Sequence, residues 1–214
     1  VTLRLVCPPI EAENGEAALV IARPEHWARS ALKGEAVFLD AEETLGKLMA
    51  NGMPKWDLFY ELVGGLIAAQ RRTHKAVRAY GEMVDILWQR GEREAATRLE
   101  EFWNDLAKVH GFSLFCAYYM DPLDSASYGG GMQCVCKTHT HLIPARDYAR
   151  LDNAVIQASR KVLDHALAQM LLSLSVAHRP STDMPIGQAT LLWLKQNMPR
   201  TADRVLSEVR ASFA

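Results

Sequence analysis

The hydrophobic pattern of residues 77–120 predicts the centre of the fold. The segment Phe112–Met120 is apolar except for Ser113. A continuous apolar run of this length is typical of a strand that is buried on both faces of a parallel sheet. We therefore expect this strand to lie in the interior of a sheet and not at its edge.

An amphipathic helix is predicted immediately before that strand. Its apolar residues recur at intervals of three and four, and charged residues fall between them; the apolar stripe contains Ala95, Leu99, Phe102, Trp103, Leu106 and Val109. Another strand begins near Val77 and leads into this helix through a short helix and a charged turn. Because a helix joins the two strands, they must be parallel, with a right-handed crossover.

The preceding part of the chain continues the alternation of strands and helices. Residues 17–22 and 36–39 predict two more strands, and Pro24 marks the first turn of a helix between them. Asp40 is placed to cap the helix that follows it. A further helix is predicted over residues 55–71. The alternating order of elements predicts an α/β fold with a parallel sheet.

The pattern changes after Asp121. A polar, Gly-rich stretch is followed by residues 132–143, which predict a strand or a hairpin. Residues 147–176 then predict one long helix, residues 183–199 predict a second, and Thr201 is placed to cap a third. The end of the chain is therefore expected to be all helical.

This change of pattern predicts two domains. We expect an α/β domain over residues 1–145 and a helical extension over residues 146–214, which serves in packing or dimerisation. Residues 1–6 alternate and then meet two prolines, so they predict an edge strand or an ordered tail. The composition, with 49% apolar and 23% charged residues among 214, is ordinary for globular protein.

Charge and cysteine content argue against several classes of protein. The formal net charge is -1 and no basic patch stands out, so direct nucleic-acid binding by this chain is not expected. The chain has no run of eighteen apolar residues and no signal segment, which predicts a soluble, cytoplasmic protein without membrane contact. Four cysteines make a poor disulfide framework, so we expect reduced thiols.

Several strings of residues resemble those of a known family. They are Arg78-Ala79-Tyr80-Gly81-Glu82-Met83, Leu87-Trp88, Trp103-Asn104 and Phe112-Ser113-Leu114-Phe115-Cys116-Ala117-Tyr118, with weaker strings over residues 15–145. This pattern resembles the MEDS domain, the sensory domain of methanogen and methylotroph regulators that include the dichloromethane repressor. Residues 1–14 depart from the family pattern, so we expect either that this chain is trimmed at its start or that the first layer of the fold is altered.

The resemblance implies both a fold and a function. The fold is a three-layer parallel sheet of RecA-like type, similar to the circadian-clock ATPases, that lacks a phosphate-binding loop and here carries an all-helical C-terminal extension. The function is sensory, regulatory and non-catalytic. Such a domain senses a small molecule and signals to an attached module or a dimer mate, for example in the regulation of transcription.

The glycines of the chain do not supply a phosphate loop. That motif needs Gly, four residues, and then Gly-Lys-Ser/Thr between a strand and a helix, and no segment has it. The run Gly129-Gly130-Gly131 is followed by Met and Gln, which provide neither the lysine nor the hydroxyl. ATP hydrolysis is therefore not favoured, although a degenerate nucleotide-binding enzyme built on Glu82 and Asp40 is an alternative. No particular cofactor is indicated.

A ligand site is expected beyond the carboxyl ends of the strands, where open parallel sheets bind their ligands. The residues that this geometry selects are Arg23, His26, Asp40, Glu82, Tyr118 and Tyr119. With aromatic and thioether side chains nearby, they suit a small, partly apolar ligand. Asp40 has the alternative of a helix cap, and the tyrosines that of core residues. Glu82 is the strongest candidate, because a carboxylate in an apolar segment needs a partner or a pocket.

A second candidate site is the segment with Cys134, Cys136, His139 and His141. These are ligand types for zinc or another thiophilic metal, and they could also form a redox-responsive switch. On one extended strand, however, the cysteines share one face and the histidines share the other. A turn at residues 137–138 would be needed to bring all four together. The alternatives are buried cysteines and hydrogen-bonded histidines.

Overall fold

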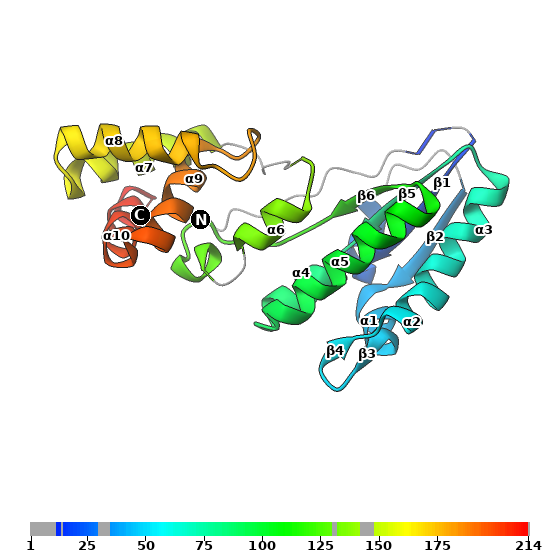
Figure 1. The fold of residues 1–214 in the computed structure, drawn as a ribbon. Coiled ribbons are helices and arrows are strands. Elements are labelled where there is room, and N and C mark those ends of the chain that lie inside the picture. Colours follow the sequence, from blue (N-terminus) through cyan, green and yellow to red (C-terminus); the bar gives the residue numbers. More distant parts are fainter. Residues whose placement is uncertain (1–11, 14, 30–34, 130–131, 142–147, 214) are drawn as a thin grey trace. The chain divides into compact units, whose positions relative to one another are not determined.

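The computed structural model describes residues 12–13, 15–29, 35–129, 132–141 and 148–213. The chain divides into two compact units between Tyr119 and Met120, which we call the sheet unit and the helical unit (Figure 1). The domain boundary expected after residue 145 stays a prediction. The strand or tail expected at residues 1–6 lies outside the described residues.

The sheet unit is built on four parallel strands. They are β1 (Glu16–Ala22), β2 (Glu35–Asp40), β5 (Ala76–Gly81) and β6 (Ser113–Cys116), in the order β2-β1-β5-β6. In the registers, Ala22 pairs with Asp40, and Gly81 pairs with both Ile21 and Cys116. The carboxyl ends of all four strands therefore meet at one edge. The predicted α/β class and the parallel pairing of β5 with β6 are confirmed.

The expected position of the strand after Phe112 is wrong. Among the described residues β6 pairs with β5 alone, so it lies at the edge of the sheet, and it ends at Cys116. The apolar residues that follow Cys116 are covered by side chains of the helices α4 (Met83–Gln89) and α5 (Arg93–His110). For example, the ring of Trp88 on α4 meets the ring of Tyr118 edge-on at 5.6 Å. The central strand is β1, in which every residue is buried.

Helices cover one face of this sheet (Figure 1). They are α1 (Ala41–Leu48), α2 (Trp56–Phe59), the π-helix η2 (Tyr60–Gly64), α3 (Gly65–Thr73), α4 (Met83–Gln89) and α5 (Arg93–His110). The helix predicted over residues 55–71 is thus present, with one π-helical segment inside it. A short hairpin, β3 (Met49–Ala50) and β4 (Met53–Pro54), turns at Asn51 and Gly52, both with positive φ.

Trp103 of α5 is the centre of the core on the helical face. It is fully buried, and its ring meets the ring of Phe59 edge-on at 5.0 Å. The ring packs on β5 at Gly81, where an added Cβ would lie 3.5 Å from it, an ordinary van der Waals contact. The predicted apolar stripe of α5 is buried as expected, except for Val109, which is exposed.

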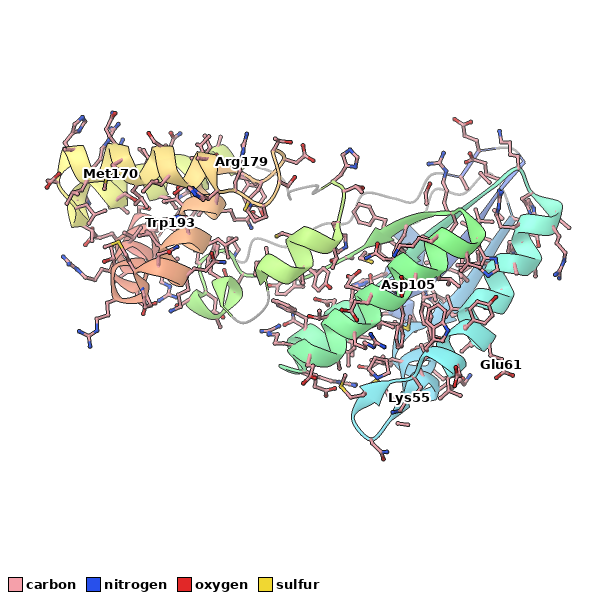
Figure 2. All side chains as sticks on the ribbon, viewed as in Figure 1. Lys55, Glu61, Asp105, Met170, Arg179 and Trp193 are labelled. Atoms are coloured by element: carbon pink, nitrogen blue, oxygen red, sulfur yellow. The ribbon has the colours of Figure 1, made fainter. Side chains whose placement is uncertain are left out.

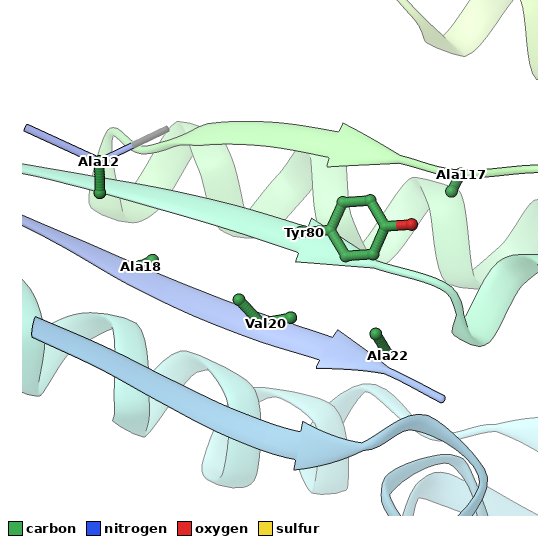
Figure 3. Close-up of a cluster of buried hydrophobic side chains, with 6 residues drawn as sticks. All are labelled: Ala12, Ala18, Val20, Ala22, Tyr80 and Ala117. Atoms are coloured by element: carbon green, nitrogen blue, oxygen red, sulfur yellow. The ribbon is translucent and has the colours of Figure 1, made fainter. Parts of the chain in front are cut away.

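The other face of the sheet carries a second cluster (Figure 3). It consists of Ala12, Ala18, Val20, Ala22, Tyr80 and Ala117. Trp27 of the 3-10 helix η1 (Pro24–Arg29) packs against this cluster, as does Phe115, which stacks on Tyr80 at 6.0 Å. Side chains alternate along a strand, so β1 serves both faces. The sheet therefore lies between the helical layer and a layer that includes η1, in agreement with a three-layer α/β fold.

The helical unit contains six helical segments among its described residues. They are η3 (Ser125–Tyr128), α6 (Met132–Thr138), α7 (Tyr148–Val162), α8 (His165–Ala177), α9 (Ile186–Asn197) and α10 (Pro199–Phe213). The predicted helical C-terminal region is confirmed. No described helix of either unit has the length and apolar character required to cross a membrane.

Three sequence predictions in this unit need correction. The strand or hairpin expected from Met132 begins instead as helix α6, whose buried residues Met132, Val135 and Cys136 have helical spacing. The long helix expected over 147–176 is two helices, because Asp164 accepts a hydrogen bond from the backbone N–H of Leu167 and caps α8. The last helix, α10, begins at Pro199, two residues before Thr201, which was expected to cap it.

Candidate functional site at the carboxyl edge of the sheet

The strand order places a topological switch point between β1 and β5. The chain leaves β1 for β2 on one side and leaves β5 for β6 on the other, so the order reverses between these two neighbours. Open α/β sheets bind ligands at such a switch point. Arg23 directly follows β1, and Glu82 directly follows β5. The topology therefore places both residues at the position where a ligand is expected.

Glu82 organises the residues at this switch point. Its side chain is buried, with only 3% of the residue exposed. Its carboxylate accepts hydrogen bonds from the backbone N–H of Arg23 at 3.0 Å, from Nδ1 of His26 at 2.8 Å and from the hydroxyl of Tyr80 at 2.8 Å. These donors offset the cost of burying the charge. Glu82 thus ties β5 to the chain that follows β1.

Arg23 bridges two buried carboxylates. Its Nη1 lies 3.4 Å from Oε2 of Glu82, and its Nη2 lies 3.0 Å from Oδ2 of Asp85. Partial burial by itself lowers the pKa of Arg23, but the charge and hydrogen bond of Asp85, together with the charge of Glu82, raise it above its ordinary value. The guanidinium is therefore permanently charged. About a quarter of the side chain remains open to solvent.

His26 is held in one orientation by Glu82. Its Nδ1 lies 2.8 and 2.9 Å from the two carboxylate oxygens. An ionised carboxylate only accepts, so Nδ1 carries the proton. Among the described residues Nε2 of His26 has no hydrogen-bond partner, and 31% of the side chain is exposed. In the neutral ring, Nε2 is therefore an acceptor that is open to a ligand.

Asp85 and Gln89 of α4 complete the cluster, and sequence reasoning missed both. Oδ1 of Asp85 accepts from the backbone N–H of Tyr119 at 2.7 Å and from Nε2 of Gln89 at 3.1 Å. Gln89 also donates to the carbonyl of Tyr119 at 2.6 Å. The available signal was Asp85 itself, a carboxylate within an apolar helical turn three residues after Glu82.

The remaining predicted residues bind elsewhere. The Asp40 side chain accepts from the backbone N–H of Glu43 at 2.9 Å and caps α1, the alternative foreseen from the sequence. Tyr118 donates to the buried Glu100 at 2.6 Å. Burial, followed by the charge of Glu100, raises the pKa of the Tyr118 hydroxyl well above its usual value. Of Tyr119, the backbone and not the side chain joins the cluster.

Glu100 forms a second buried polar group with the end of β6. It accepts from the thiol of Cys116 at 3.4 Å as well as from Tyr118. Burial and the neighbouring carboxylate raise the pKa of the Cys116 thiol well above its usual value, so the thiol stays protonated. Tyr118 also meets Trp88, whose ring lies 3.7 Å below the guanidinium carbon of Arg93.

The cysteine and histidine segment is partly described. Cys136 is buried in α6, and burial raises the pKa of its thiol to about 11, which makes it unreactive at neutral pH. Nδ1 of His139 contacts the carbonyl of Val135 at 2.7 Å. His141 is exposed, and the side chain of Cys134 lies outside the described part. The sequence argument placed the cysteines and histidines on one extended strand, but Met132–Thr138 is the helix α6. The metal-binding and redox roles of this segment stay predictions.

Comparison with known proteins identifies the family. No curated protein and no solved structure gives a significant match to the chain. A family model described as MEDS, the MEthanogen/methylotroph, DcmR Sensory domain, matches residues 9–140. That segment is more than half of the chain, and it includes all four strands of the sheet and the whole Glu82 cluster. The chain therefore belongs to the MEDS family of sensory domains.

Proposed function

We propose that the chain is a non-catalytic sensor that binds a small, partly apolar molecule bearing a hydroxyl group. The ligand sits at the switch point between β1 and β5 and contacts Arg23 and His26. The observation that carries the proposal is that buried Glu82 fixes both side chains there and leaves Nε2 of His26 without a described partner. Membership of a sensory family supports the same role.

The hydrogen-bonding capacity of the site favours a hydroxyl group. His26 offers an acceptor at Nε2, and Arg23 offers the N–H groups that Glu82 and Asp85 leave over. Both side chains contact Oε2 of Glu82, so they lie side by side. A hydroxyl group donates one hydrogen bond and accepts two, and it can satisfy both neighbours. A carboxylate ligand cannot donate to Nε2, and it would bring a further negative charge close to two buried carboxylates.

An apolar wall lies next to these polar groups. Trp27 follows His26 on η1, and its indole N–H donates to the carbonyl of Ala22, the last residue of β1, at 3.2 Å. The ring is half-buried and meets Phe38 of β2 at 5.8 Å. A small alcohol could place its hydroxyl between Arg23 and His26 and its hydrocarbon part towards this ring. This combination of one polar anchor and an apolar wall is common in ligand sites.

The signal is proposed to leave through a partner or a dimer mate. The chain itself does not bind nucleic acid in this proposal, and it acts on an attached regulatory module or through the helical unit. The outer side of α8 supports the second route, because its large apolar residues are exposed and the helix has no Asp, Glu, Lys or Arg. Exposed apolar patches are often interaction surfaces.

The binding test compares alcohols with matched compounds that lack the hydroxyl. Benzyl alcohol and 1-butanol are titrated into the full chain, with toluene and 1-chlorobutane as controls, while calorimetry and the ¹⁵N resonance of the His26 ring are followed. We expect the alcohols to bind, to shift the Nε2 resonance and to be recovered unchanged. Equal binding of the controls, or no binding by either alcohol, would overturn the proposal.

A matched variant separates ligand contact from folding. The amide nitrogen of Asn can occupy the place of Nδ1, so His26→Asn keeps a donor for Glu82 and removes Nε2. Affinity for benzyl alcohol should fall at least about tenfold while the melting temperature changes little, a loss of about 1.4 kcal/mol in binding. Glu42→Gln, at an exposed position of α1, is the control and should bind normally. Nucleotide binding with turnover that Glu82→Gln abolishes would instead favour the degenerate enzyme.

A further inference from the structure

The backbone of Tyr119 is held at both its N–H and its carbonyl by one helix. Its N–H donates to Oδ1 of Asp85 at 2.7 Å, and its carbonyl accepts from Nε2 of Gln89 at 2.6 Å. Gln89 also donates to Oδ1 of Asp85 at 3.1 Å, which closes the arrangement. Strand pairing does not require these bonds, because β6 has already ended at Cys116. Asp85 and Gln89, one helical turn apart on α4, thus form a clamp on the backbone of a single residue.

The clamp is placed where the chain leaves the sheet unit. Tyr119 is the last residue of that unit, and Met120 is the first residue of the helical unit. The next polar anchors belong to the helical unit itself, beginning with the side chain of Asp121, which accepts from the N–H of Leu123 at 2.9 Å. The bonds that Asp85 and Gln89 make to Tyr119 therefore restrain the last residue before the junction.

The same carboxylate that holds Tyr119 also holds Arg23. Oδ2 of Asp85 lies 3.0 Å from Nη2 of Arg23, while Oδ1 accepts from Tyr119. Asp85 is buried, with 3% of the residue exposed, so the carboxylate charge depends on these donors and not on water. A displacement of Arg23 leaves Asp85 without its cation, and the carboxylate must then shift or lose its bond to Tyr119.

We infer that Asp85 and Gln89 are positioning residues that transmit occupancy of the Arg23 and His26 site to the junction at Tyr119. The inference rests on the proposed function. A ligand oxygen that accepts from a remaining N–H of Arg23 draws the guanidinium away from Asp85, weakens the Arg23–Asp85 pair and loosens the clamp. The signal is then a change in the freedom of the Tyr119 backbone, carried through two side chains, at the start of the helical unit.

Amide hydrogen exchange of the full chain tests the clamp without any ligand. In Gln89→Ala, an exposed position, exchange at the Tyr119 amide should be at least about tenfold faster, whereas the amide of Leu19 in β1 should keep its protection. Arg23→Gln should give the same local effect. In the double variant, the combined effect should be smaller than the product of the two single effects, because both act on one clamp.

A second ion pair of the sheet supplies the control. Arg78 of β5 donates from Nε to Glu16 of β1 at 2.8 Å, so Arg78→Gln also breaks an Arg–carboxylate pair. It should leave exchange at Tyr119 relative to Leu19 unchanged. Unchanged Tyr119 exchange in Gln89→Ala, or equal acceleration at Tyr119 and Leu19 in Arg23→Gln, would overturn the inference and reduce these residues to general stabilisers.

Adding benzyl alcohol distinguishes this inference from the proposed function. If it binds, exchange at Tyr119 should become at least about tenfold faster in the wild type and should not change further in Gln89→Ala. If benzyl alcohol binds and amide exchange at Tyr119 does not change, the inferred role of Asp85 and Gln89 is wrong, whereas the proposed ligand-binding function stands. If benzyl alcohol does not bind, the proposed function fails, and the ligand-free exchange of the variants decides the clamp by itself.

Discussion

The carboxyl edge of the sheet and the outer side of α8 differ in which side chains are buried and which are exposed. At the sheet edge, Glu82 and Asp85 are charged and almost completely buried. On α8, Leu167 and Met170 are apolar and exposed, Met170 to 54%, on a helix without a single Asp, Glu, Lys or Arg (Figure 2). Hydrophobicity alone would have assigned these four side chains the reverse positions.

The difference shows that available partners decide burial. Glu82 and Asp85 are buried because each receives at least three hydrogen bonds or ion pairs. The inward side of α8 is already filled by Ala168, Leu171 and Ser175, so the other half of the helix remains outside. Stability should therefore depend more on the buried charges than on the exposed apolar residues, which mutations can test.

The largest expected effect is at the sheet edge. Glu82→Ala removes the acceptor shared by Arg23, His26 and Tyr80 and leaves the charge of Arg23 paired with Asp85 alone. The free energy of unfolding should fall by about 3–5 kcal/mol, the cost of breaking a buried ion pair. Equilibrium denaturation with guanidinium chloride measures this loss of free energy of unfolding. Glu42→Ala, which breaks an exposed pair with Arg90, should cost about 0–1 kcal/mol. A loss below 1 kcal/mol for Glu82→Ala would contradict the comparison.

An intermediate effect is expected from two neighbours on α8. Leu171 is 3% exposed, so Leu171→Ala creates a cavity and should cost about 2–4 kcal/mol. Met170 is largely exposed, so Met170→Ala should change the free energy of unfolding by no more than about 0.5 kcal/mol. The same denaturation experiment compares them. Similar losses for both variants would mean that the outer side of α8 is covered in solution.

The smallest expected effect is a pH dependence at the amino end of the sheet. The hydrogen bond from Arg78, with a second from the backbone of Glu13, lowers the pKa of Glu16 from 4.5 to about 2 despite the opposing effect of burial. A lowered folded-state pKa stabilises the protein above pH 4.5, and this contribution is lost as the pH falls towards 2.

Glu16→Gln removes this pH dependence. Between pH 5 and pH 2.5, the urea midpoint of the wild type should fall more than that of Glu16→Gln, whose amide does not titrate. Parallel pH profiles would show that Glu16 and Arg78 are not paired in solution. The charge at this end of the sheet would then differ from the charges at the carboxyl edge even more than expected.

The spacing of apolar and polar residues predicted most of the fold, because each helix or strand is recognisable from residues that are close in sequence. The crossover from β5 through α5 to β6, and the cap at Asp40, were each visible in a few consecutive residues. The edge position of β6 was not visible in the sequence. An apolar run predicts that a segment is buried, but it does not show whether strands or helices cover it. At α6, Met132, Val135 and Cys136 fit a helical stripe, but the alternation of Met132, Cys134 and Cys136 also fits a strand.

The candidate site was predicted only as far as strand ends define it. Arg23, His26 and Glu82 were selected because they follow β1 and β5, and the structure brings them together. Asp85 and Gln89 lie inside a helix, where no strand-end rule applies. Their bonds join residues 62, 34 and 30 positions apart in the chain. Such pairings depend on how the strands and helices are assembled and leave no local pattern.

The backbone of Glu82 gives its carboxylate a further consequence. Its N–H donates to the carbonyl of Ile21 at 2.9 Å, while its side chain binds the chain just beyond β1. If β5 slipped by one residue against β1, every side chain of β5 would change faces, and the carboxylate would lose its donors from Arg23 and His26 at once. Misaligned sheets are thereby penalised during folding, so the Glu82 cluster forms in the same step in which the strands find their correct alignment.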